Sequence, residues 1–273
     1  MWLCVVIGSF GSCETYRTVD YPLPSAAPRP VAVGLWAPDQ PLRIFADWTI
    51  PLQSSPLPPK GADSLQVTLM VAGGQTYPLI PQEGSLFGLV QPPAVQAGAV
   101  LTLSIDCSRC GGPWTAQDTV PAAGEIVSVS ATIDSSTRSY RAELTFRAPP
   151  GSRYFGFSQV LLGPDSLPLS PAFPQGEEMR LPDEFGTLPA ASIPSYSFSL
   201  APSTYFGPLR ISGLRVWLFS LSPASHAFLM SQAEYEGTYG DFLVAPVEVV
   251  SNFSHEIGFW GLYQLDSATV FFP

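Results

Sequence analysis

Proline is spread along the whole chain and constrains its fold more than any other residue. The 273 residues include 30 prolines and 23 glycines. Because a proline inside a helix removes a hydrogen bond and clashes with the preceding turn, long helices are excluded. Disorder is excluded as well, since 46% of the residues are apolar and only 12% are charged. The sequence therefore predicts an all-β protein with many turns.

The net negative charge of the chain limits the kinds of molecule that it can bind. The chain has 22 acidic and 12 basic residues and a formal net charge of −10, which repels phosphate backbones. We therefore expect no nucleic-acid partner. At roughly 150 residues per domain the length predicts two domains, each large enough to form a core without a metal or other cofactor.

The amino terminus resembles a secretory signal that ends at a lipoprotein cleavage site. An apolar run over residues 2–10 is followed by Gly11-Ser12-Cys13, and the first charged residue is Glu14. We expect residues 1–12 to be a signal peptide and Cys13 to be acylated, because two or more acyl chains anchor a protein stably to a bilayer. The run is short and has no preceding Lys or Arg, which suggests a true start upstream. A buried amino-terminal strand is the alternative.

A proline-rich tether follows the cysteine. Residues 13–30 include Pro22, Pro24, Pro28 and Pro30, which favour an extended polyproline conformation. This predicts a globular part held away from an outer membrane, and we favour the cell surface over the periplasmic face. Glu14 and Asp20 resemble, with only two acids, the acidic stretch that marks lipoproteins for export to the cell surface.

The first predicted domain covers residues 31–122 and is an immunoglobulin-like β-sandwich. Its short strands are separated by turn residues, and Gly73-Gly74 marks a hairpin. The predicted strands are 31–36, 42–50, 64–75, 76–80, 86–90, 100–105 and 114–120.

The second predicted domain, residues 123–273, is another β-sandwich. Apolar and polar residues alternate over 127–133 and 140–147, which predicts strands with one buried face each. One short helix is expected, with Ser222 as N-cap, Pro223 at its first position and Gly237 at its end. Ala224, Phe228 and Tyr235 would share a face of that helix. The remaining predicted strands are 154–162, 196–200, 209–221, 247–250, 258–262 and 269–272.

Cys107 and Cys110 form a Cys-x-x-Cys pair beside Gly111-Gly112. A tetrahedral zinc site would lack half its ligands, because no second pair or histidine accompanies it. In an exported protein we expect a local structural disulfide rather than a redox centre.

Catalytic motifs give no positive support for an enzyme. His226 and His255 stand apart, and the chain has no nucleophile elbow, Walker loop or dinucleotide turn. Acidic residues cluster loosely at 177–178 and 183–184, where a solvated loop is the simplest interpretation. A hydrolase with dispersed active-site residues remains an alternative.

Tryptophan side chains are further candidates, because they stack on sugars or protein partners when exposed and fill cores when buried. The five concerned are Trp36, Trp48, Trp114, Trp217 and Trp260.

The order of these features resembles a family of Bacteroidetes lipoproteins grouped as domain of unknown function 4249. The mature chain begins Cys-Glu, passes through a proline-containing tether and continues with a strand, a turn and a strand over residues 31–44. A carboxy-terminal signature is similar as well: Pro246-Val247, Ser251-Asn252-Phe253 and Gly258-Phe259-Trp260-Gly261 match the family's ending in outline.

The resemblance implies an accessory lipoprotein, because members are often encoded beside TonB-dependent outer-membrane receptors. It therefore predicts a non-catalytic binding subunit of such a receptor, anchored in the bilayer through Cys13. The alternative is a free-standing surface module for carbohydrate or peptide. Such bacteria also O-glycosylate Asp-Ser/Thr followed by an apolar residue, a weak pattern that begins here at Asp63, Asp118, Asp165 and Asp266.

Overall fold

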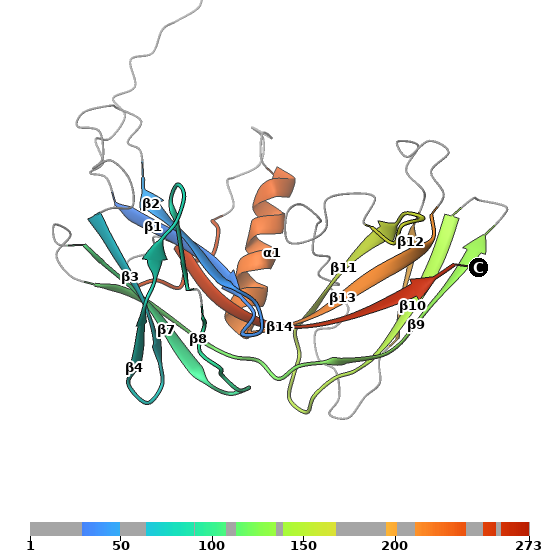
Figure 1. Ribbon diagram of the computed structural model, residues 1–273, viewed down its shortest axis with the longest axis horizontal. Helices are drawn as coiled ribbons and strands as arrows, with labels where there is room; N and C mark the ends of the chain where they lie inside the picture. The colour runs from blue at the N-terminus through green and yellow to red at the C-terminus, as the bar shows by residue number, and fades with distance from the viewer. Residues whose placement is uncertain are drawn as a thin grey trace, which may run out of the picture.

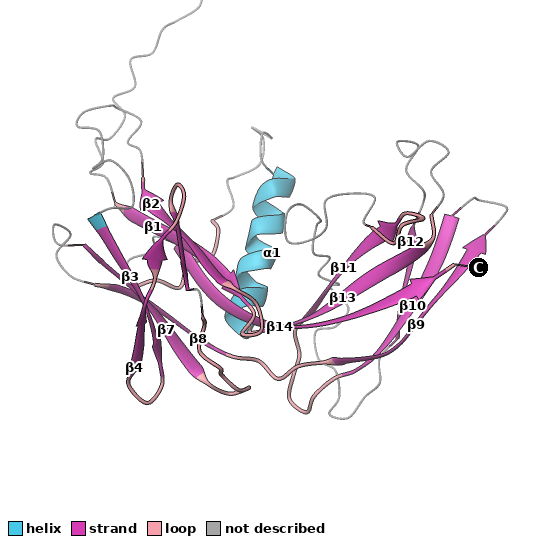
Figure 2. Ribbon diagram, viewed as in Figure 1, coloured by secondary structure: helices cyan, strands magenta, loops and turns pink. Residues whose placement is uncertain are grey.

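The computed structural model describes residues 29–49, 64–89, 91–107, 113–134, 139–167, 195–200, 211–238, 248–254 and 258–272. These residues form fourteen strands and one helix (Figures 1 and 2). The strands of the amino-terminal half are β1 (Pro30–Trp36), β2 (Leu42–Trp48), β3 (Leu65–Val71), β4 (Gln75–Pro78), β5 (Ile80–Pro81), β6 (Leu86–Leu89), β7 (Val100–Cys107) and β8 (Trp114–Thr119). The others are β9 (Glu125–Asp134), β10 (Ser139–Arg147), β11 (Phe155–Leu162), β12 (Ser195–Leu200), β13 (Gly213–Leu221) and β14 (Gly258–Phe271), with α1 (Pro223–Thr238) before the last.

Three sheets build two sandwiches. A seven-stranded sheet has the order β11-β13-β14-β1-β2-β6-β5, and its two ends belong to different sandwiches. In the first sandwich the β14-β1-β2-β6-β5 end faces the sheet β4-β3-β7-β8, whereas in the second the β11-β13-β14 end faces β12-β10-β9. The predicted all-β class with two β-sandwiches and one helix near the carboxy-terminal strands is confirmed.

Strand β14 is shared by the two sandwiches. Its first residues pair in parallel with β1, from Gly258 opposite Ala32 to Leu262 opposite Trp36. From Tyr263 onward it pairs antiparallel with β13. Figure 1 shows this strand running from one sandwich into the other, with α1 above the crossing.

The predicted domain division at residues 122/123 did not anticipate this sharing. The boundary falls between β8 and β9, but Phe253, Trp260 and Leu262 pack in the core of the first sandwich. The carboxy-terminal strands were also predicted as separate segments at 258–262 and 269–272, whereas the structure has one strand through both. Residues 248–250, predicted as strand, are not in one.

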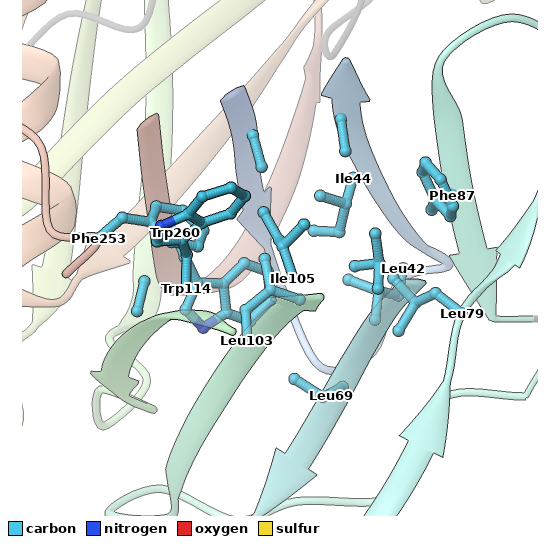
Figure 3. Packing of buried hydrophobic residues seen from close by; sticks show 14 of the residues in the cluster. Leu42, Ile44, Leu69, Leu79, Phe87, Leu103, Ile105, Trp114, Phe253 and Trp260 are labelled. Carbon is cyan, nitrogen blue, oxygen red and sulfur yellow. The ribbon is translucent and has the colours of Figure 1, made fainter. Parts of the chain in front are cut away.

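The core of the first sandwich follows from strand alternation. In β2, Leu42, Ile44 and Ala46 are buried and the residues between them face outward. They meet Leu103 and Ile105 of β7 across the sandwich (Figure 3).

The core of the second sandwich confirms one predicted pattern and corrects another. Ala142, Leu144 and Phe146 of β10 are fully buried, as their alternation predicts. Val127 of β9 was expected on the buried face but is 47% exposed. The register explains this, because Thr145 pairs with Ser128 and Phe146 with Ile126, which leaves Val127 as the extra residue of a β-bulge.

Helix α1 begins where it was predicted. The Ser222 hydroxyl accepts a hydrogen bond from the Ser225 amide at 2.9 Å, which is N-cap geometry. The predicted buried face is corrected: Ser225, Phe228 and Ser231 are buried, whereas Tyr235 is 37% exposed. The helix packs closely on β14, since a Cβ at Gly261 would overlap the Ser225 hydroxyl.

Candidate functional site

The edge of β14 is closed by side chains where the strand leaves the first sandwich. Before β13 becomes its neighbour, the outer backbone groups of β14 need other partners. Asn252 supplies a pair, because its Oδ1 accepts from the Trp260 amide at 2.9 Å and its Nδ2 donates to the Trp260 carbonyl at 2.6 Å. The Ser251 hydroxyl donates to the Gly258 carbonyl at 2.6 Å. The Ser251-Asn252 and Gly258–Gly261 elements of the carboxy-terminal signature therefore hold the crossing together.

Asp118 continues this closure one step along the strand. Its Oδ2 accepts from the Leu262 amide at 2.7 Å and from the Ser222 hydroxyl at 2.6 Å, and its Oδ1 accepts from the Thr119 amide at 2.8 Å. The Ser225 hydroxyl donates to the Leu262 carbonyl at 3.0 Å. One carboxylate thus connects β8 of the first sandwich, the start of α1 and the shared strand.

The environment of Asp118 alters its acidity. The residue is only 7% exposed. Burial raises the pKa of the Asp118 carboxyl above its ordinary value, although the hydrogen bonds from Ser222, Thr119 and Leu262 act in the opposite direction. The neutral form is therefore easier to reach here than in water.

A groove of about 670 Å³ lies beside this network, at the junction of the sandwiches. Its walls are the turn before β7, the linker from β8 to β9, the turn before β11 and the start of α1. The lining residues are Ala97, Gly98, Val120, Pro121, Ala122, Pro150, Gly151, Ser152, Arg153, Tyr154, Leu221 and Pro223. Arg153 is the one charged side chain among them.

The Ser222 hydroxyl, which lies beside the groove, is not arranged as a nucleophile. Ser222 is fully buried, donates to Asp118 and accepts from the Ser225 amide, so its lone pairs are not presented to a ligand. The ring of His226, one helical turn later, lies against Tyr154, with centroids 4.6 Å apart and the ring planes tilted by 33°. His255 lies outside the described residues. The Ser222 hydroxyl therefore serves the junction of the sandwiches, where it donates to Asp118 and caps α1.

A second candidate surface is an apolar row on the outer face of the first sandwich. Leu86, Phe45, Val33 and Phe259 stand opposite one another on β6, β2, β1 and β14. Phe228 of α1 covers the last, with the two rings stacked 4.0 Å apart. The other three are 36%, 44% and 39% exposed, respectively. Exposed apolar groups in contact with one another are typical of protein-interaction surfaces.

The predicted cysteine sites fall mostly outside the described part of the chain. Cys13 and Cys110 are not among the described residues. Cys107, at the end of β7, is disulfide-bonded and 4% exposed. A disulfide at this position agrees with a structural role, since the residue packs in the first core. The acidic pairs at 177–178 and 183–184 also lie outside the described residues.

The tryptophan candidates belong to the protein interior. All five are buried, with exposed fractions from 0% to 8%. Trp36 and Trp260 stack on each other at 6.3 Å in the first core, so neither offers a face to a sugar. The five buried tryptophans are Trp36, Trp48, Trp114, Trp217 and Trp260.

Sequence reasoning missed two residues that matter here. Asp118 was noticed only as part of a glycosylation pattern, although Trp114, Ala116 and Asp118 alternate along one strand and the first two are apolar. That alternation places an acid on a buried face, which is a usable signal. No sequence pattern pointed to Arg153, because the groove that it lines is formed by turns from both sandwiches.

The described residues contain neither a helix that could cross a membrane nor a cluster of metal ligands. None of their helices combines the length and apolarity that a membrane crossing requires. Nor do three His, Cys, Asp or Glu side chains gather anywhere within those ranges in a way that would hold a metal ion.

Comparisons with known proteins give distant likenesses alone. No family model and no curated protein matches the chain. A segment of two fibronectin type III domains from chicken tenascin is 14% identical and covers 73% of this chain and 87% of that one, with a TM-score of 0.22. Salmonella alpha-2-macroglobulin reacted with methylamine is 11% identical and covers 90% of this chain and 15% of that one, with a TM-score of 0.27. Likenesses at such scores carry no argument about function.

Proposed function

We propose that this chain is a non-catalytic accessory protein of the outer membrane, held there by an acylated Cys13 and docked on a TonB-dependent receptor. The anchor and the receptor class rest on the amino-terminal sequence and on the resemblance to the lipoprotein family. The observation that carries the docking step is the apolar row of Val33, Phe45 and Leu86.

The row is suited to a protein contact for two reasons. Its three exposed members stand opposite one another in neighbouring strands, so they form one continuous apolar strip. The strip continues the interface in which Phe228 of α1 already covers Phe259. A partner element lying beside α1 would extend an existing helix-on-sheet layer.

The accessory role is tested by crosslinking from defined positions. A photoreactive residue replaces Phe45 in the strip or Gln66, an exposed residue on the opposite sheet of the same sandwich. We expect irradiation of native membranes to join position 45, and not position 66, to a TonB-dependent receptor. Equal capture at both positions, or no receptor adduct from position 45, would contradict the docking proposal.

The anchor needs a separate measurement. Mass spectrometry of the protein extracted from native membranes should find an acylated residue 13 at the new amino terminus. An unmodified Cys13 with residues 1–12 still attached would refute the lipoprotein assignment.

A further inference from the structure

We infer that the groove at the junction of the two sandwiches binds a ligand that carries one carboxylate on an apolar body. The inference concerns a different surface from the apolar strip of the proposed function. It rests on the groove's rigidity, its lining and the position of one arginine.

The groove is built before any ligand arrives. The Gly98 amide donates to the Val120 carbonyl at 2.8 Å, and the Val120 amide donates to the Ala99 carbonyl at 2.9 Å. On the other side, the Leu221 amide donates to the Tyr154 carbonyl at 2.9 Å. These bonds connect loops of both sandwiches to strand ends, so binding requires little ordering of the walls.

Most of the lining is apolar and poor in donors. Its accessible apolar surface comes from Ala97, Pro121, Ala122, Pro150 and Pro223, because Val120 and Leu221 are almost fully buried, with exposed fractions of 1% and 4%. Pro121, Pro150 and Pro223 have no amide hydrogen. The volume of about 670 Å³ lies within the usual range for small-molecule sites. The main body of a ligand would therefore be held by apolar contact.

Arg153 gives the groove its charge preference. The lining contains no Asp or Glu, although the whole chain has 22 acidic residues against 12 basic ones. Within the described ranges Arg147 forms an ion pair with Glu125, whereas Arg153 has no acidic side chain within ion-pair distance. A guanidinium binds a carboxylate with two parallel hydrogen bonds, whereas it gains much less from a neutral amide. The lining hydroxyls of Ser152 and Tyr154 add neutral donors.

Two ligand sources share this chemistry, and paired probes separate them. N-acetyl-phenylalanine represents the carboxy terminus of a peptide, and octanoate represents a fatty acid. Each is compared with its own carboxamide, which keeps the body and removes the charge. Binding is followed by the amide NMR signals of Gly98 and Gly151 in the full chain, with Gly73 in the β3–β4 turn as the reference.

We expect at least one acid to shift the Gly98 and Gly151 signals saturably and its carboxamide to bind at least tenfold more weakly. Arg153→Gln should abolish that tenfold preference, and Arg147→Gln, which changes an exposed arginine outside the groove, should preserve it. Whichever acid binds more tightly identifies the source.

Several results would overturn the inference. They are equal binding of acid and carboxamide, a preference that survives Arg153→Gln, shifts at Gly73 as large as those at Gly98, and no response to either acid. None of them bears on the crosslinks from position 45, so failure here and failure of the accessory role can be told apart.

Discussion

Asp118 offers a direct test of how the two sandwiches are held together. In Asp118→Ala the Leu262 amide loses its acceptor in a buried place, which costs about 1–3 kcal/mol. The Ser222 hydroxyl loses its acceptor too, but it can turn to the Ser225 hydroxyl oxygen 3.0 Å away, so it adds little. The exposed Thr119 can give its amide to water. We therefore expect the free energy of unfolding to fall by about 1–3 kcal/mol, nearly all of it from the Leu262 amide.

Asp118→Asn separates the charge from the hydrogen bonds. Its amide oxygen can replace Oδ2 and keep the bonds from Ser222 and Leu262, while the bond from Thr119 is lost. A loss of about 1 kcal/mol or less is expected at neutral pH. Asp165→Asn, at an exposed carboxylate in a loop, is the matched control and should change the free energy by less than about 0.5 kcal/mol.

The pH dependence has a defined sign. Because burial raises the pKa of Asp118 above the ordinary value of 3.8 for an aspartate, the folded chain binds this proton at a higher pH than the unfolded chain does. The contribution of this group to stability is therefore greatest below that value and decreases as the pH rises through the folded pKa. Relative to Asp118→Asn, the unmodified protein should gain stability as the pH is lowered from 7 toward 4.

Urea unfolding followed by tryptophan fluorescence measures these differences, since five tryptophans are buried. Other carboxylates are common to both proteins, so their titration cancels in the difference. A difference that does not change with pH, or that changes in the opposite direction, would refute the assignment of a buried, proton-sensitive carboxylate. A loss below about 0.5 kcal/mol for Asp118→Ala would refute its structural role.

Three further predictions concern the shared strand. Asn252→Ala removes both side-chain bonds to the Trp260 backbone and should lower the free energy of unfolding by about 1–3 kcal/mol in urea titrations, whereas a change below about 0.5 kcal/mol would mean that water replaces the amide. Gly261→Ala places a methyl group against α1, and we expect a loss of about 1–3 kcal/mol; unchanged thermal unfolding would show that the helix moves aside at no cost. Burial, together with the charge of Asp39, raises the pKa of Tyr263 to about 12, so ultraviolet titration should show Tyr263 as a late-ionising tyrosine. The free energy of unfolding should fall between pH 10 and 12, because the folded chain holds this proton more tightly than the unfolded chain. Asp39→Asn should shift the ionisation of Tyr263 to lower pH.

The sequence was most informative where one local rule decides the structure. Alternation identified β10 correctly, because Ala142, Leu144 and Phe146 face one core. Ser222 and Pro223 identified the start of α1, because N-capping depends on neighbouring residues only.

Sequence patterns gave wrong predictions where a contact between residues distant in sequence determines the local structure. The bulge at Val127 arises from pairing with β10, and no pattern inside β9 announces it. The buried face of α1 depends on Gly261, which accepts the small Ser225 against the sheet. The strands predicted at 258–262 and 269–272 are one strand, because the residues from Tyr263 to Phe271 pair with β13. Asp266 on this stretch also accepts a hydrogen bond from the Ile126 amide at 2.7 Å.

The candidate surfaces were harder to predict than the strands. The apolar strip depends on the register among β1, β2 and β6, which a single sequence does not reveal. The groove is formed by loops that are distant in sequence, so the sequence alone does not show that Arg153 lines the same groove as Gly98 and Val120.

The shared strand also determines when the protein can finish folding. Phe253, Trp260 and Leu262 complete a core whose other members begin at Ala32, so a chain that emerges amino terminus first lacks these parts until residues 253–262 appear. The second sandwich waits for the same segment, because β13 needs β14 as a neighbour. Synthesis or export from the amino terminus therefore delivers an unfinished polypeptide until β14 has emerged, and neither sandwich is complete before that strand arrives.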